Sequence, residues 1–255
     1  MKTQGHVNWL TDEQMARLEP YFPKSHGKPR VDDRRVLSGI IFVNRNGLRW
    51  RDAPAAYGPH KTLYNRWKRW SEAGVFVRMM EGLSGTQAER RTVMIDATYL
   101  KAHRTASSLR GKKGGLGRLI GRTKGGMNTK LHAVTDANGR PISLFVTAGQ
   151  VSDYTGAAAL LDSLPRAQWL LGDRGYDADW FRDALEAKGI TPCIPGRKTR
   201  NEPVRYDKRR YKRRNRIEIM FGRLKDWRRV ATRYDRCPNV FLSAIALAAT
   251  VLFWL

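Results

Sequence analysis

The order of strand-like and helix-like segments after Thr92 constrains the fold more than any other feature of this 255-residue chain. TVMIDATYL predicts a first strand, and two further β-rich runs flank the turn Asp136–Gly139, which is a strong hairpin signal. WLLGD and GITPCIP predict two more strands, and a helix-like stretch precedes each of them. Three strands in a meander, followed by alternating helices and strands, indicate an α/β domain with a mixed sheet. The Gly-, Lys- and Arg-rich segment Gly111–Gly126 is expected to be a loop.

The first ninety residues are predicted to be helical. Thr11 and Gln14 form a capping box for one helix, one of the aspartates at positions 32 and 33 caps a second that ends at Gly47, and a third covers Lys61–Glu72. The third helix interleaves basic and aromatic side chains, as expected for a helix-turn-helix module that binds DNA. The alternative is that its tryptophans are core residues and its charges form a solvated face. The candidate DNA-binding residues of this helix are Tyr64, Arg66, Lys68 and Arg69.

These patterns divide the chain into a helical module at residues 1–82, a linker at residues 83–91 and an α/β domain at residues 92–255. The closing run Phe241–Leu255 is almost wholly apolar, but its length falls short of the roughly 20 residues that span a bilayer. We therefore expect a buried helix at the end of the chain.

Charge predicts the kind of partner. The chain has 48 Lys and Arg against 23 Asp and Glu, a net charge of +25, so its partner is expected to be a polyanion, with nucleic acid the first candidate. An acidic membrane surface is the rival, but no basic amphipathic helix or lipidation motif supports it. The first ten residues contain no apolar signal sequence, so we expect a cytoplasmic, nucleoid-associated protein without a membrane partner. Cys193 and Cys237 have no Cys or His at ligand spacing, which argues against a zinc site.

One glutamate, Glu218, lies within the most basic stretch of the chain. On a helix at about 100° per residue, Tyr211, Arg214, Glu218 and Lys225 fall within an arc of about 60°, beside an apolar stripe. This arrangement is typical of a functional site rather than of a charged surface. The alternative is that Glu218 only forms an ion pair with Arg214 one turn earlier.

Two other carboxylates occupy positions suited to chemistry. Asp96 lies in the middle of an apolar strand, where burial is costly unless the charge is paired or binds a cation. Asp173 lies at the end of a strand, where α/β sheets usually bind ligands. With Glu218 they would form a set of oxygen ligands that favours Mg²⁺, or alternatively Mn²⁺, and two such ions can cleave a phosphodiester. Alternatively, Asp173 is a turn residue and Asp96 binds backbone amides. The other strand-end and helix-start aspartates, Asp136, Asp153, Asp177 and Asp179, are predicted to be turn or cap residues.

The motifs IDAT around Asp96 and GDRGYD around Asp173, with the tetrad Tyr211, Arg214, Glu218 and Lys225, resemble bacterial insertion-sequence DDE transposases of the small-element group with a Tyr-Arg-Glu-Lys signature. The resemblance extends from about Leu10 to the end of the chain.

This resemblance implies an RNase H-like catalytic domain at residues 92–255, in which Asp96, Asp173 and Glu218 bind two Mg²⁺ ions. It further implies that Tyr211, Arg214 and Lys225 hold DNA phosphates. The protein would bind the terminal inverted repeats of its element, cut them and join them to target DNA, as a homodimer on paired ends. Two alternatives are another RNase H-like nuclease, such as a junction resolvase, and a domesticated DNA-binding protein that has lost catalysis.

Overall fold

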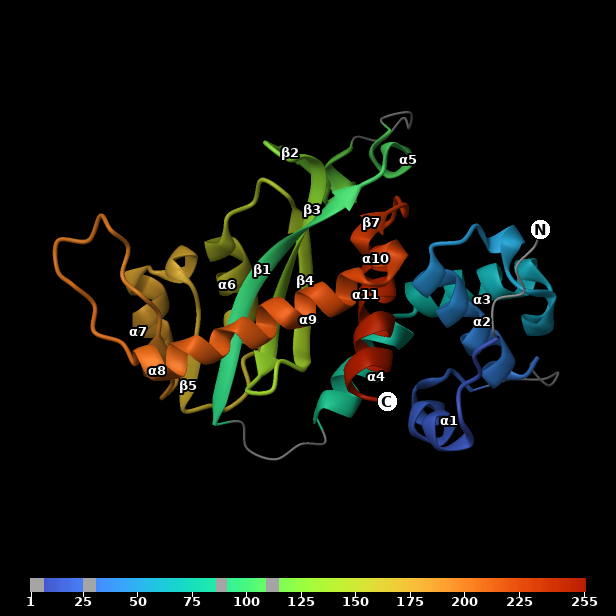
Figure 1. Cartoon of the computed structure of the whole chain (residues 1–255), viewed down its shortest axis with the longest axis horizontal. Helices are drawn as coiled ribbons and strands as arrows, with labels where there is room; N and C mark the ends of the chain where they lie inside the picture. The colour runs from blue at the N-terminus through green and yellow to red at the C-terminus, as the bar shows by residue number, and fades with distance from the viewer. Residues whose placement is uncertain (1–6, 25–30, 86–90, 109–114) are drawn as a thin grey trace.

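The computed structural model describes residues 7–24, 31–85, 91–108 and 115–255 (Figure 1). In the N-terminal third, the helices are α1 (Asp12–Leu18), α2 (Asp33–Asn46), α3 (His60–Glu72) and α4 (Val75–Gly85). The strands are β1 (Thr92–Ala102), β2 (Gly121–Thr123), β3 (Gly126–Asp136), β4 (Pro141–Ala148), β5 (Trp169–Leu171), β6 (Thr191–Cys193) and β7 (Thr232–Arg233). The remaining helices are α5 (Arg104–Ser107), α6 (Asp153–Leu161), α7 (Asp179–Ala187), α8 (Lys208–Tyr211), α9 (Asn215–Lys225), α10 (Arg228–Ala231) and α11 (Pro238–Phe253).

The sheet is mixed, as the sequence predicts. The long strand β1 pairs antiparallel with β3 on one side and parallel with β5 on the other, and β5 pairs parallel with β6. The hairpin of β3 and β4 closes at the predicted turn, where Asp136 Oδ1 accepts hydrogen bonds from the backbone amides of Asn138 and Arg140. The expected loop at Gly111–Gly126 differs, because β2 within it pairs with the start of β3; residues 111–114 lie outside the described residues.

Each face of the sheet is covered by helices. Met94 and Leu100 of β1 belong to a core shared with α9 and α11, whereas Val93 and Ile95 belong to a second core shared with α6 and α7. Successive side chains of a strand point to opposite faces, so Asp96 and Thr98 lie on the α9 face. Figure 1 shows α9 crossing β1 on that face.

The predicted helices of the N-terminal third are present. The capping box of Thr11 and Gln14 begins α1, Asp32 caps α2, and Gly47 ends it with φ +65°, a left-handed conformation that glycine tolerates. These helices share one core with α11, which packs against α4. The expected linker at residues 83–91 is wrong at its start, because α4 extends through Gly85 and buries Leu83; residues 86–90 lie outside the described residues.

Helix α11 is buried over most of its length, as predicted for the apolar C-terminal run. Within the residues that the structure describes, no helix is long and apolar enough to cross a membrane.

The basic segment from Lys208 to Lys225 is not one regular helix. A 3-10 turn at Lys212–Arg214 separates α8 from α9, so the expected 100° periodicity is interrupted there. Two cap predictions are also wrong: Ser152, not Asp153, caps α6, and Ala178, not Asp179, precedes α7.

The shared core makes a stability prediction. Ile245 of α11 is fully buried, and Ile245→Ala should lower the free energy of unfolding by about 2–5 kcal/mol, because it removes packed methyl groups and leaves a cavity. Hydrogen exchange should show weaker protection in α2 and α3 as well as in the sheet. The matched control is Ile219→Ala in α9, where the side chain is 57% exposed, and a change within about 0.5 kcal/mol is expected. Unchanged protection of α2 and α3 in Ile245→Ala would contradict a shared core.

Candidate active site between the central strand and helix α9

Asp96 is a carboxylate placed in the middle of the central strand with only 14% of its side chain exposed. Its Oδ1 accepts a hydrogen bond of 2.8 Å from the Ala97 amide, and its Oδ2 accepts one of 2.7 Å from Arg214 Nη1. Burial, with a smaller contribution from the negative charge of Asp173, raises the pKa of Asp96 to about 6 against the opposing effect of Arg214. The carboxyl group is therefore poised to change charge near neutral pH and to gain from a bound cation.

Arg214 connects Asp96 to Glu218. It lies at the end of the 3-10 turn before α9, and while Nη1 binds Asp96, Nη2 binds Glu218 Oε1 one turn along. Its guanidinium also lies 5.8 Å from the centre of the Tyr211 ring. The Arg214–Glu218 ion pair of the simpler interpretation is thus present, but the same arginine joins the pair to a strand 118 residues earlier.

Lys225 reaches the same strand from the other end of α9. Its Nζ donates a hydrogen bond of 2.7 Å to Thr98 Oγ1, two residues after Asp96 on the same face of β1. Burial lowers the pKa of Lys225. The apolar stripe of α9 is buried as its periodicity predicts, so the helix has a fixed orientation over the strand.

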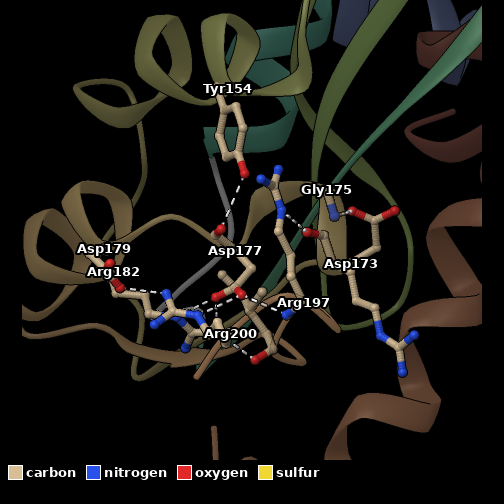
Figure 2. A network of polar contacts seen from close by, with 10 residues as sticks. Tyr154, Asp173, Gly175, Asp177, Asp179, Arg182, Arg197 and Arg200 are labelled. Atoms are coloured by element: carbon tan, nitrogen blue, oxygen red, sulfur yellow. Dashed lines mark hydrogen bonds and ion pairs between the residues drawn. The ribbon is translucent and has the colours of Figure 1, made fainter. Parts of the chain in front are cut away.

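Asp173 follows β5 by two residues and begins the 3-10 turn Arg174–Tyr176, where its Oδ1 accepts a 2.8 Å hydrogen bond from the Gly175 amide (Figure 2). The turn interpretation is therefore correct for one of its oxygens. Because β5 is the parallel neighbour of β1, this turn lies near Asp96, and the charge of Asp173 affects the pKa of Asp96.

The structure brings a further carboxylate, Asp153, to this turn. A Cβ atom built on Gly175 would lie 2.8 Å from Asp173 Oδ1 and 3.3 Å from Asp153 Oδ2. The other oxygen of Asp153 binds the buried Nζ of Lys130 at 3.1 Å. Its position at the start of α6 predicted only a cap, and no local sequence signal indicates that α6 begins beside Asp173.

The donor set suits a hard cation, but the carboxylates are not assembled around one point. Among the described residues, no three His, Cys, Asp or Glu side chains are close enough together to hold a metal ion. Instead, the guanidinium of Arg214 supplies the positive charge between Asp96 and Glu218. A metal ion bound by these two carboxylates would neutralise the negative charge that Arg214 now neutralises.

The candidate residues of α3 fall into two groups. Arg66 is 7% exposed, forms an ion pair with Asp33 of α2 and lies 5.1 Å from the Trp70 ring, so its prediction as a DNA contact is wrong. A paired, buried guanidinium is not available to a phosphate. Exposed side chains on the other face of the helix are Tyr64, Lys68 and Arg69.

Comparison with known proteins identifies the family. Residues 87–254 match the family model "Transposase DDE domain", and residues 10–80 match the model "Putative transposase of IS4/5 family". The chain therefore belongs to the DDE transposase family, and its function is that of an insertion-sequence transposase rather than of a junction resolvase.

Relatives agree with this assignment. A Brucella ovis protein, "Putative transposase for insertion sequence element IS6501", is 36% identical over 130 residues, which are 51% of this chain and 99% of the relative. A Burkholderia cepacia protein, "Putative transposase for insertion sequence element IS402", is 31% identical over 137 residues, which are 49% of this chain and 63% of the relative.

A solved structure, the piggyBac transposase synaptic complex with hairpin DNA, superposes with a TM-score of 0.54 at 8% identity, covering 96% of this chain and 70% of that one. At this identity the likeness concerns the fold alone, and it confirms the RNase H-like prediction.

The raised pKa of Asp96 predicts a pH-dependent effect of Asp96→Asn. A carboxyl group with a pKa near 6 in the folded protein and 3.8 unfolded stabilises the fold fully below about pH 3.8 and loses this contribution as the pH rises through about 6. Asparagine stays neutral. The free energy of unfolding of the variant should therefore rise relative to that of the wild type, by on the order of 2 kcal/mol, as the pH increases from 4 to 7. Urea unfolding with EDTA present measures this difference. A difference that does not vary with pH would contradict the raised pKa.

Proposed function

We propose that this transposase binds the terminal inverted repeats of its insertion sequence and cuts and joins DNA at a centre formed by Asp96, Asp173 and Glu218. The observation that carries the proposal is the bridge of Arg214 between Asp96 and Glu218, which joins a strand and a helix far apart in sequence. Asp173, in the turn that follows the neighbouring strand β5, supports the proposal because its charge acts on Asp96.

The cofactor we propose is Mg²⁺, with Mn²⁺ as the alternative. Oxygen ligands without sulfur or imidazole favour these hard cations, which activate water and stabilise the leaving oxygen in phosphodiester cleavage. In the protein alone, Arg214 neutralises two of the carboxylates. A metal ion bound by Asp96 and Glu218 would replace Arg214 as their counter-charge. The guanidinium, beside the Tyr211 ring, would then be free to bind a DNA phosphate.

Several groups are proposed to hold DNA. Tyr211, Arg214 and Lys225 flank the carboxylates and would contact phosphates at the cut site. The exposed side chains of α3, namely Tyr64, Lys68 and Arg69, would contact the element ends in a helix-turn-helix context. Two ends must be joined in transposition, so we propose a homodimer on paired ends.

The triad of Asp96, Asp173 and Glu218 makes a direct prediction. Asp96→Asn, Asp173→Asn and Glu218→Gln should each reduce Mg²⁺-dependent cleavage of an oligonucleotide carrying an element end by at least about 100-fold, because each removes a ligand. Gel-shift affinity for the same DNA should stay near that of the wild type. The control is Asp183→Asn, an exposed acid on α7. Cutting at the wild-type rate by Glu218→Gln would exclude the triad, and a wild-type protein that binds but never cuts would identify a domesticated copy.

Lys225 can be tested apart from the carboxylates. Lys225→Ala should slow cleavage about tenfold, because it removes a positive charge held over β1. Mn²⁺ affinity, measured by calorimetry, should change little. Arg223→Ala is the matched control on the same helix: Arg223 lies 4.5 Å from the Phe253 ring and donates to the Leu252 carbonyl, away from the site. Equal damage from both variants would mean that α9 presents an undifferentiated basic surface.

A further inference from the structure

The carboxylate of Asp177, four residues after Asp173, is fully buried and surrounded by arginines (Figure 2). Its Oδ1 accepts hydrogen bonds of 2.9 and 2.8 Å from Nε and Nη2 of Arg182. Its Oδ2 accepts 2.8 Å from Arg200 Nε and 2.7 Å from the Arg197 amide. Burial alone would raise the pKa of Asp177, but these hydrogen bonds outweigh it and hold the pKa below its usual value.

These contacts fold the segment after β6 back onto the turn that begins with Asp173. Arg182 Nη2 also donates 2.7 Å to the Ile194 carbonyl, and Arg200 also pairs with Asp179. Tyr154 of α6 donates its hydroxyl to the Asp177 carbonyl at 3.1 Å. One buried carboxylate thereby fixes three segments relative to one another: the turn, α7 and residues 194–200.

Arg197 differs from the other two arginines of this network. Its guanidinium lies 4.7 Å from the centre of the Tyr154 ring, and its Nε donates 3.3 Å to the carbonyl of Arg174, the residue after Asp173. The side chain is exposed, and among the described residues no acidic group forms an ion pair with it. Arg182 and Arg200, in contrast, are paired with carboxylates.

A guanidinium that packs against a ring and donates to a carbonyl has no carboxylate that neutralises it. It also loses little side-chain conformational entropy when it binds a ligand. Such a group suits the bidentate recognition of a phosphate. Its contact with the Arg174 carbonyl places it beside Asp173.

We infer that Arg197 is a DNA-phosphate contact beside the active site, and that Asp177 is the positioning residue that places it there. The inference rests on the proposed function only in taking Asp173 as part of the cutting centre. The ligand is the DNA backbone at the phosphates adjoining the Asp173 turn, and the contact carries no base specificity.

The first test compares two neighbouring cations. Arg197→Ala and Lys198→Ala remove the same charge from adjacent exposed positions, but only Arg197 is held beside the turn. With duplex DNA that carries an element end, Arg197→Ala should make the negative slope of log K against log salt less steep by about 0.9, which corresponds to the loss of one phosphate contact. It should also reduce cleavage about tenfold. Lys198→Ala should change both much less. Arg197→Lys should restore the slope but only part of the cleavage, because lysine cannot make the bidentate contact of a guanidinium. Equal slopes for the two alanine variants would overturn the inference.

The second test addresses positioning. Asp177→Asn should reproduce the cleavage loss of Arg197→Ala, and the double variant should lose little more, because both changes remove the same contact. Additive losses would overturn the role of Asp177. If Asp177→Asn fails to fold, Tyr154→Leu, which removes the ring beneath Arg197, takes its place with the same expectation.

The two proposals fail differently. The salt-slope comparison is repeated in the Asp173→Asn protein, where it does not depend on catalysis. A retained difference between Arg197→Ala and Lys198→Ala, with unreduced cutting by Asp173→Asn, would exclude the triad while leaving the phosphate contact. If the difference between Arg197→Ala and Lys198→Ala is absent while Asp173→Asn abolishes cutting, the phosphate contact is excluded and the triad is retained.

Discussion

The geometry of the candidate active site depends on the ion pairs of Arg214. A carboxylate in the middle of a central strand is costly to bury, and Arg214 offsets this cost for Asp96 while binding Glu218 with its other nitrogen. The same contact fixes α9 against β1 at one end, and the hydrogen bond from Lys225 to Thr98 fixes it at the other. The helix that carries the last acid is thus positioned over the strand that carries the first.

Local patterns were sufficient to predict much of this arrangement. The hairpin followed from a four-residue turn whose first residue, Asp136, binds the amides after it, and the mixed sheet followed from the order of segment types. The orientation of α9 followed from its apolar stripe, because Glu218 lies beside the buried face of the helix and therefore at the edge of the contact with the strand. The interruption at Lys212–Arg214 did not disturb this orientation, because Arg214 still reaches Glu218 one turn later.

Contacts between distant segments were not predictable in the same way. Arg66 and Asp33 are each typical surface residues by local pattern, and only the packing of α3 on α2 makes them a buried pair. Asp153 and Asp177 occupy positions that favour caps and turns. Asp153 nevertheless lies beside Asp173, and Asp177 binds two other segments, α7 and residues 197–200. Such roles depend on which elements meet in three dimensions, and local sequence patterns do not show this.

The net charge of +25 predicts a polyanionic partner, but the structure shows that the basic residues are not equivalent. Arg233 is fully buried, donates to Thr129 and to backbone carbonyls, and has its pKa lowered to about 10 by burial. Arg66 and Arg200 are likewise committed to carboxylates within the fold. A cation of this kind cannot exchange its protein partners for a phosphate without leaving a buried charge unpaired. The charge available to a polyanion is therefore smaller than the composition indicates, and it is carried by cations that are exposed and have no carboxylate partner, as Arg197 does among the described residues.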